Sequence, residues 1–131
     1  MNSTMETAGT PETDPGPEPT ENFLELPDGR IHYLDWGGGG VQAHFLHGNG
    51  FCAGTYTPFI RHLVDDLHIL ASDVRGHGAS DQPRVKRIRH WDIFAEDLKN
   101  LIEQKMSPPV MGMGHSLGAV TTYMAAAKYP H

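Results

Sequence analysis

Cysteine is almost missing from this chain of 131 residues, in which Cys52 stands alone. A single cysteine cannot close an intrachain disulfide or build a cysteine-based zinc site, so we expect neither. No apolar run approaches the roughly 18 residues that a membrane-spanning helix requires. The first residues also lack the basic and then apolar pattern of a secretory leader. These absences predict a cytoplasmic protein that does not contact a membrane.

Basic residues are missing from the first part of the chain. Residues 1–22 hold five of the 16 acidic residues and none of the 10 basic ones. They also contain four prolines and hardly any apolar side chain, so burial cannot offset the entropy lost on folding. We therefore expect a disordered acidic tail over residues 1–22 and folded structure from Phe23 onward. The rest of the chain carries 11 acidic and 10 basic residues, and this near-neutral body predicts no nucleic-acid partner.

The folded part shows a hairpin pattern followed by strands that alternate with helices. Short apolar runs flanked by turn residues predict strands over 23–26, 30–36, 43–46, 68–73 and 109–113. Apolar residues at helical spacing predict helices over 57–67, with Thr57 as N-cap, over 91–102 and over 117–128. Strands that alternate with helices are typical of right-handed crossovers. The expected fold is therefore α/β, a mostly parallel sheet in a three-layer arrangement.

The stretch most informative about chemistry is Gly114-His115-Ser116-Leu117-Gly118, a Gly-x-Ser-x-Gly pattern between an expected strand and an expected helix. The turn is so tight that a side chain two positions before or after its tip would clash, which requires glycine at Gly114 and Gly118. This geometry directs the Ser116 hydroxyl outward at the carboxyl end of the strand, beside a helix N-terminus. The pattern therefore indicates that Ser116 is a nucleophile.

Three motifs, in this order and spacing, resemble the α/β-hydrolase superfamily. The His-Gly-Asn-Gly stretch over 47–50 is similar to the oxyanion loop of that family, and the Asp-Val-Arg-Gly-His-Gly-Ala-Ser stretch over 73–80 to its Asp-x-Arg-Gly-His-Gly-x-Ser segment. The stretch over 114–118 is similar to its nucleophile elbow. The resemblance covers about residues 23–131. It implies that the backbone N–H groups of Asn49 and Leu117 would hold an oxyanion.

The identity of the residue at the elbow narrows the expected reaction. Superfamily members that open epoxides or displace halide carry aspartate at this position, whereas this chain has Ser116. The resemblance thus implies a serine hydrolase, esterase-like, that cleaves a small acyl substrate (ester, thioester or amide) through an acyl-enzyme. It implies no metal and no cofactor. The sequence leaves the substrate and the oligomeric state open.

The chain departs from the family pattern in its length. In the family the triad acid and histidine follow the nucleophile, but only 15 residues follow Ser116. They contain no acid, and their one histidine, His131, comes too early to match. We therefore expect residues 23–131 to be the N-terminal part of an α/β-hydrolase domain, truncated after the elbow helix and inactive alone. Two alternatives stay open: a truncated non-catalytic product, and a pseudo-enzyme or small-molecule-binding protein on the same fold.

Several other polar residues near these motifs are expected to have structural roles. His47 is expected to brace its loop rather than act as a base. His115 flanks the nucleophile, but the elbow should turn its side chain away. The resemblance implies that Asp73, Arg75 and His77 mainly hold their loop together.

Overall fold

The computed structural model describes residues 16–84, 88 and 90–130. The part of the predicted acidic tail over residues 1–15 lies outside the described residues. The elements, in chain order, are β2 (Thr20–Leu26), β3 (Gly29–Asp35), β4 (Val41–Leu46), the 3₁₀ helix η1 (Ala53–Tyr56), α1 (Thr57–Ile60), β5 (Leu67–Ser72), α2 (Asp92–Lys105), β6 (Met111–Gly114) and α3 (Leu117–Lys128).

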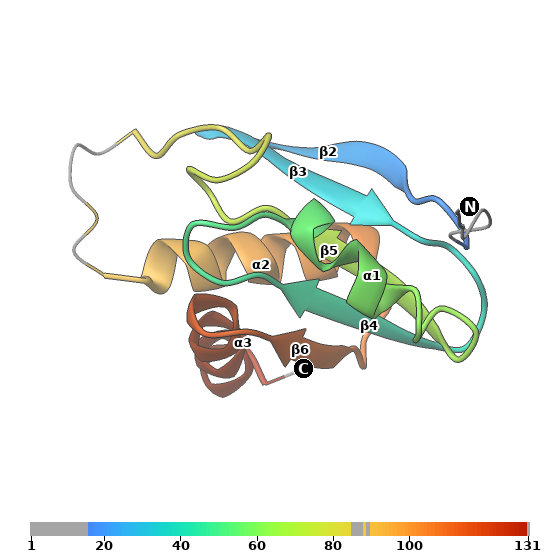
Figure 1. Cartoon of the computed structure of the whole chain (residues 1–131). Helices are drawn as coiled ribbons and strands as arrows, with labels where there is room; N and C mark the ends of the chain where they lie inside the picture. The colour runs from blue at the N-terminus through green and yellow to red at the C-terminus, as the bar shows by residue number, and fades with distance from the viewer. Residues whose placement is uncertain (1–15, 85–87, 89, 131) are drawn as a thin grey trace, which may run out of the picture.

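The strands of the described chain form one sheet in the order β2-β3-β5-β4-β6 (Figure 1). The pairs β4–β5 and β4–β6 are parallel, whereas β2–β3 and β3–β5 are antiparallel. It follows that β3 alone runs against the other four strands. The predicted α/β class with a mostly parallel sheet is thus confirmed, and the β2–β3 hairpin supplies the antiparallel part.

Alternating side chains along the strands bury two separate apolar layers. On one face, Phe45 and Ile69 pack with Ile60 of α1. On the other face, Leu46 packs with α2 and α3, whose buried apolar residues include Phe94, Leu98, Leu117 and Ala125. Neighbouring residues of one strand point to opposite faces of a sheet, so one apolar strand such as β4 serves both layers. This arrangement gives the three layers that the sequence predicted.

Several element boundaries differ from the sequence expectation, most of them by one to three residues, and two of the differences matter for the fold. The sheet begins at Thr20, three residues before Phe23, because Thr20 to Asn22 continue the pairing of β2 with β3. Residues 20–22 therefore belong to the fold and not to the tail. In the second case, α1 ends at Ile60 instead of Leu67, and Thr57 is its first residue rather than its N-cap. Beyond it the Leu63 N–H bonds to the Ile60 carbonyl, a tighter pitch that still packs Leu63, Val64 and Leu67 against the core around Ile60.

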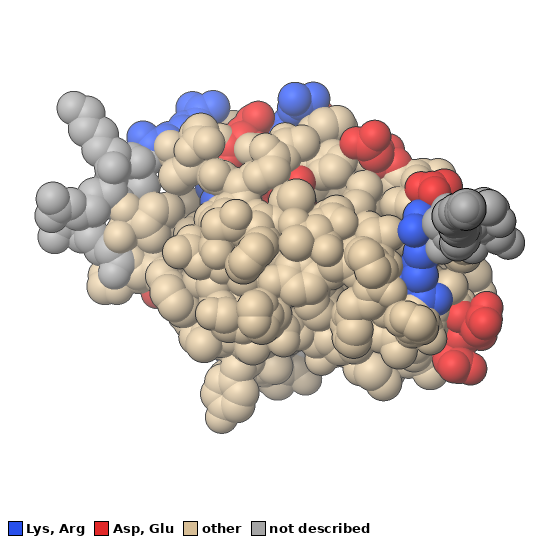
Figure 2. Space-filling view, viewed as in Figure 1, with Lys and Arg blue, Asp and Glu red and all other residues tan. Residues whose placement is uncertain are grey.

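The parallel strands end at one edge of the sheet, and this alignment brings the three motifs together. Leu46, the last residue of β4, pairs with Ser72 at the end of β5 and with Gly114 at the end of β6. The loops that follow these strands therefore start side by side, as expected for a ligand site in a parallel sheet. Over the middle of the face seen in Figure 2 the surface carries hardly any Lys, Arg, Asp or Glu, and charged groups lie toward its rim. Among the described residues, no helix is long and apolar enough to span a bilayer.

Candidate active site

Ser116 occupies a strained position at the tip of the turn between β6 and α3. Its φ of 54° makes it the one non-glycine residue with positive φ in the part of the chain that the structure describes. Such a conformation costs a residue with a side chain about 1–3 kcal/mol and is found mostly at functional sites. Ser116 is exposed although the residues that follow it, Leu117 and Gly118, are buried. The turn therefore presents the Ser116 side chain to solvent.

The two glycines beside Ser116 lie where the backbone of the turn meets other backbone. A Cβ on Gly114 would lie 2.5 Å from the backbone nitrogen of Ala119. A Cβ on Gly118 would overlap the carbonyl oxygen of Leu46 and would lie 2.6 Å from that of His47. Real Cβ atoms do not approach backbone this closely, so any larger residue would push the elbow away from β4.

Two backbone N–H groups near Ser116 are free to bind an anion. The first turn of α3 uses the N–H of Gly118, which bonds to the His115 carbonyl at 2.9 Å, but no described residue accepts the N–H of Leu117. The backbone N–H of Asn49 likewise has no acceptor among the described residues. A helix N-terminus with an unpaired N–H favours negative charge. Asn49 and Leu117 line the same cavity of about 340 Å³, together with His77 and Trp91.

The oxyanion loop is braced by His47, which is fully buried. Its Nδ1 donates to the Gly48 carbonyl at 2.7 Å, and its Nε2 accepts the Val74 N–H at 2.8 Å. An imidazole that donates with one nitrogen and accepts with the other is neutral, and burial lowers the pKa of His47. This histidine therefore holds the loops after β4 and β5 together, as expected from the sequence, and both of its nitrogens are occupied.

The side chain of His115 contacts Tyr56, a residue that the sequence analysis missed. The Tyr56 hydroxyl lies 2.7 Å from His115 Nδ1 and accepts the Gly48 N–H at 3.0 Å. Tyr56 ends the short 3₁₀ helix and follows no recognisable motif. No signal in the sequence could have singled it out, since its role depends on where two other segments lie.

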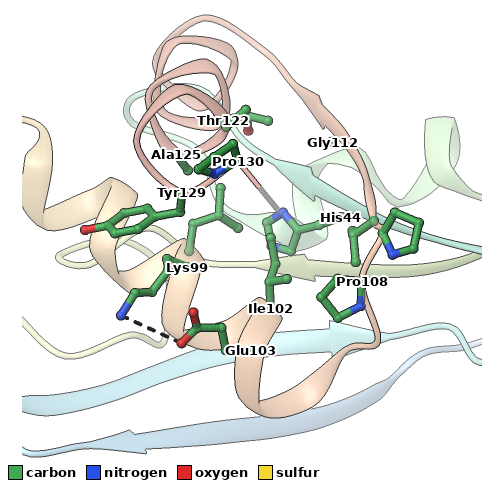
Figure 3. Close-up of a pocket in the computed structure, with 14 residues that line it drawn as sticks. His44, Lys99, Ile102, Glu103, Pro108, Gly112, Thr122, Ala125, Tyr129 and Pro130 are labelled. Atoms are coloured by element: carbon green, nitrogen blue, oxygen red, sulfur yellow. Dashed lines mark ion pairs between the residues drawn. The ribbon is translucent and has the colours of Figure 1, made fainter.

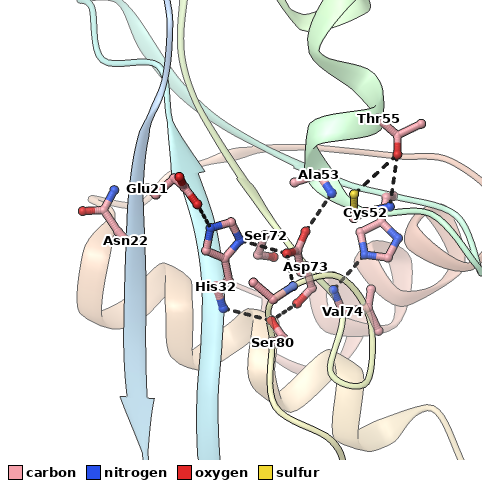
Figure 4. A network of polar contacts seen from close by, with 12 residues as sticks. Glu21, Asn22, His32, Cys52, Ala53, Thr55, Ser72, Asp73, Val74 and Ser80 are labelled. Carbon is pink, nitrogen blue, oxygen red and sulfur yellow. Dashed lines mark hydrogen bonds and ion pairs between the residues drawn. The ribbon is translucent and has the colours of Figure 1, made fainter.

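Asp73 is the centre of a buried polar network (Figure 4). Its carboxylate accepts the backbone N–H of Ala53 at 2.7 Å and that of Ala79 at 2.9 Å. His32 Nδ1 lies 2.8 Å from the same carboxylate, and His32 Nε2 lies 3.0 Å from Glu21 Oε1. Asp73 is thus fully engaged in holding η1, β3 and the loop after β5. The sequence motif pointed to Asp73, but its partners His32 and Glu21 were not predicted.

Arg75 fixes the same loop from the other side. Its guanidinium donates to both carboxylate oxygens of Asp97 in α2, each at 2.8 Å, and to the Asp28 carbonyl at 3.0 Å. The hydrogen bonds that Arg75 donates to Asp97 are the main cause of the raised pKa of Arg75. His77 completes the loop, since its Nε2 lies 3.2 Å from the side-chain oxygen of Asn49. Asp73, Arg75 and His77 thus hold the loop after β5 in place, as the family resemblance implied.

A second cavity, of about 260 Å³, lies between α2, α3 and the start of β6 (Figure 3). Its lining includes His44 but neither Ser116 nor the two free N–H groups. His44 Nε2 contacts the Ser72 hydroxyl at 2.8 Å, whereas its Nδ1 has no partner. Burial lowers the pKa of His44 to about 3, so this histidine is neutral near pH 7. No group of three or more His, Cys, Asp or Glu side chains suited to a metal ion occurs within the described parts of the chain.

The geometry agrees with the comparisons with known proteins. Residues 42–131 match the family described as serine aminopeptidase, S33. The chain is 36% identical over 93 residues to 2-(acetamidomethylene)succinate hydrolase of Mesorhizobium japonicum, covering 71% of this chain and 33% of that protein. It is 34% identical over 89 residues to monoglyceride lipase of Homo sapiens, covering 64% of this chain and 29% of the lipase.

A solved structure of a hydrolase has the same fold. The crystal structure of E-2-(acetamidomethylene)succinate hydrolase superposes with a TM-score of 0.76 at 28% identity, covering 86% of this chain and 41% of that one. The chain spans about a third of the length of the curated relatives named above. With the elbow, the loop over 47–50 and the sheet order all in place, the chain belongs to the α/β-hydrolase superfamily, in the serine aminopeptidase S33 family.

Proposed function

We propose that this chain carries the nucleophile and the oxyanion hole of a serine hydrolase that cleaves a small acyl substrate. The observation that carries the proposal is the geometry of Ser116, an exposed residue held at positive φ where β6 turns into α3. The unpaired N–H groups of Leu117 and Asn49 support it, because these two residues line one cavity and the two groups could share an oxyanion. The relatives support hydrolysis in general, since their names include a lipase and a succinate hydrolase.

In the proposed reaction, Ser116 Oγ attacks the carbonyl carbon of an ester, thioester or amide and gives its proton to a base. The carbonyl oxygen becomes an oxyanion and accepts hydrogen bonds from the two N–H groups. Collapse of the tetrahedral intermediate breaks the bond to the alcohol, thiol or amine, which leaves with a proton. Water then hydrolyses the acyl-enzyme and regenerates Ser116. Serine at the elbow favours this acyl route over the alkyl-enzyme route of aspartate nucleophiles.

The base and the acid are proposed to lie outside residues 1–131. Near the elbow, His47 has both ring nitrogens in hydrogen bonds, and the Nδ1 of His115 contacts the Tyr56 hydroxyl. Asp73 is buried and already accepts several hydrogen bonds. The relatives extend well beyond the region matched here, which supports a search for these two groups in the rest of the protein. We expect residues 1–131 alone to hydrolyse no ester.

A fluorophosphonate probe tests the proposal, because it labels only activated serine nucleophiles. The protein expressed from its complete reading frame should be labelled, and Ser116→Ala should abolish the labelling. Ser107→Ala, at another exposed serine, is the matched control and should be labelled like the unaltered protein. Labelling that survives in Ser116→Ala would refute the assignment. Ligand binding without labelling would favour a pseudo-enzyme or binding protein on this fold.

We further propose that the protein works in the cytoplasm on a small-molecule substrate. The support is that no helix of the described residues is long and apolar enough to cross a bilayer. Cell fractionation followed by detection of the protein tests this location, and recovery in the membrane pellet would contradict it.

A further inference from the structure

The Tyr56 hydroxyl joins the oxyanion loop to the nucleophile elbow. It accepts the Gly48 N–H at 3.0 Å and lies 2.7 Å from Nδ1 of His115. The phenol oxygen accepts the Gly48 N–H, and its hydrogen bond with His115 runs from the phenol to Nδ1 or from Nδ1–H to the phenol according to the His115 tautomer. One oxygen thus links the residue before Asn49 to the residue before Ser116.

This link controls the direction of an N–H group of the proposed oxyanion hole. The peptide unit between Gly48 and Asn49 is planar, so the orientation of its carbonyl fixes that of the Asn49 N–H. The Gly48 carbonyl accepts bonds from His47 Nδ1 at 2.7 Å and from the Phe51 N–H at 3.1 Å. The Gly48 N–H, on the other side of the same residue, is held by Tyr56. Both ends of Gly48 are therefore fixed, and the Asn49 N–H follows.

Close packing shows that the contact is built into both segments. A Cβ on Gly48 would lie 2.9 Å from His115 Nδ1, so a larger residue would displace the His115 side chain from this position. The Tyr56 ring packs on the ring of Phe45 in β4, with the ring centroids 4.7 Å apart, and this contact holds the Tyr56 side chain in place. Removal of the hydroxyl alone therefore leaves the ring in place.

We propose that Tyr56 is a positioning residue, which holds the Asn49 N–H in register with Ser116 through Gly48 and His115. The inference rests on the proposed function, because it assigns a partner to the same oxyanion hole. Tyr56 touches neither the nucleophile nor the proposed oxyanion. Its effect is to keep two N–H donors, one from each segment, at the separation that a single oxygen atom needs.

The test uses p-nitrophenyl butyrate and the protein expressed from its complete reading frame. Loss of a whole oxyanion donor lowers kcat by about 10²–10³-fold, and a donor that is retained but less well held should cost about tenfold. We expect Tyr56→Phe to lower kcat about tenfold with KM changed by less than about twofold. Tyr123→Phe removes the same hydroxyl from an exposed tyrosine of α3 and is the matched control, with kcat unchanged.

A double variant separates positioning from general stability. If Tyr56 acts through His115, then Tyr56→Phe and His115→Ala each lower kcat, and the double variant loses no more than the worse single one. Additive losses, an unchanged kcat in Tyr56→Phe, or a fall that follows loss of folded protein by circular dichroism would overturn the inference. An unaltered protein that hydrolyses no probe and resists fluorophosphonate would instead remove the proposed function, and the role of Tyr56 with it.

Discussion

Replacement of Gly118 by alanine tests the elbow geometry most directly. The added Cβ would overlap the carbonyl oxygen of Leu46 and lie 2.6 Å from that of His47. Leu46 is the last residue of β4, which pairs with β5 on one side and β6 on the other, and His47 follows it directly. Backbone held on both sides cannot move away without breaking these pairings. Overpacking against side chains costs about 1–3 kcal/mol, so against fixed backbone we expect Gly118→Ala to lower the free energy of unfolding by at least about 3 kcal/mol.

Urea denaturation followed by circular dichroism measures this loss, and a thermal scan should show a fall in Tm of about 10–20 °C. Gly54→Ala is the matched control, because a Cβ there meets no atom within 4 Å. It should change the free energy of unfolding by less than about 1 kcal/mol. If Gly118→Ala is as mild as Gly54→Ala, the close approach of the elbow to β4 is wrong. The steric account of the glycine requirement would then be refuted.

Two further predictions concern buried polar groups. Arg75→Met should lower the free energy of unfolding by about 3–5 kcal/mol in urea denaturation, because it leaves the Asp97 carboxylate buried without its partner. The double variant Arg75→Met/Asp97→Leu should recover most of this loss. Equal losses in the two variants would contradict the pairing. The second prediction concerns His44, whose pKa is about 3 in the folded protein against the ordinary 6.5. Between these two pH values the unfolded chain binds a proton at His44 that the folded protein does not bind. The stability that the neutral His44 contributes above pH 6.5 is therefore lost as the pH falls toward 3. Between pH 7.5 and 5.5 the free energy of unfolding should fall by about 1.4 kcal/mol because of His44, and His44→Leu should weaken this pH dependence. If the pH dependence is unchanged in His44→Leu, His44 is not its source.

The sequence predicted the features that depend on short stretches of chain. The bounds of α3 agree with the expectation over 117–128, because its start is set by the Gly-x-Ser-x-Gly turn itself. The steric demand at Gly114 and Gly118 arises within the same few residues and the strand beside them. By contrast, α1 is shorter than its apolar spacing indicated, since tighter turns bury the same side chains. Spacing specifies which face is buried but not the pitch that buries it.

What the sequence alone determined was the order of strands and helices and the Gly-x-Ser-x-Gly turn between β6 and α3, because periodicity and a tight turn are local properties. Only the tertiary structure decided which residues support that elbow. Tyr56 and His115 are 59 residues apart, and His32 and Asp73 are 41 apart, so neither pair has a recognisable spacing. The parallel strands β4 and β6 bring the segments of Tyr56 and His115 together by ending at the same edge of the sheet, whereas His32 and Asp73 meet where β3 runs antiparallel to β5. A hydrogen bond is effective over about 3 Å, and the packing of the whole sheet sets those distances.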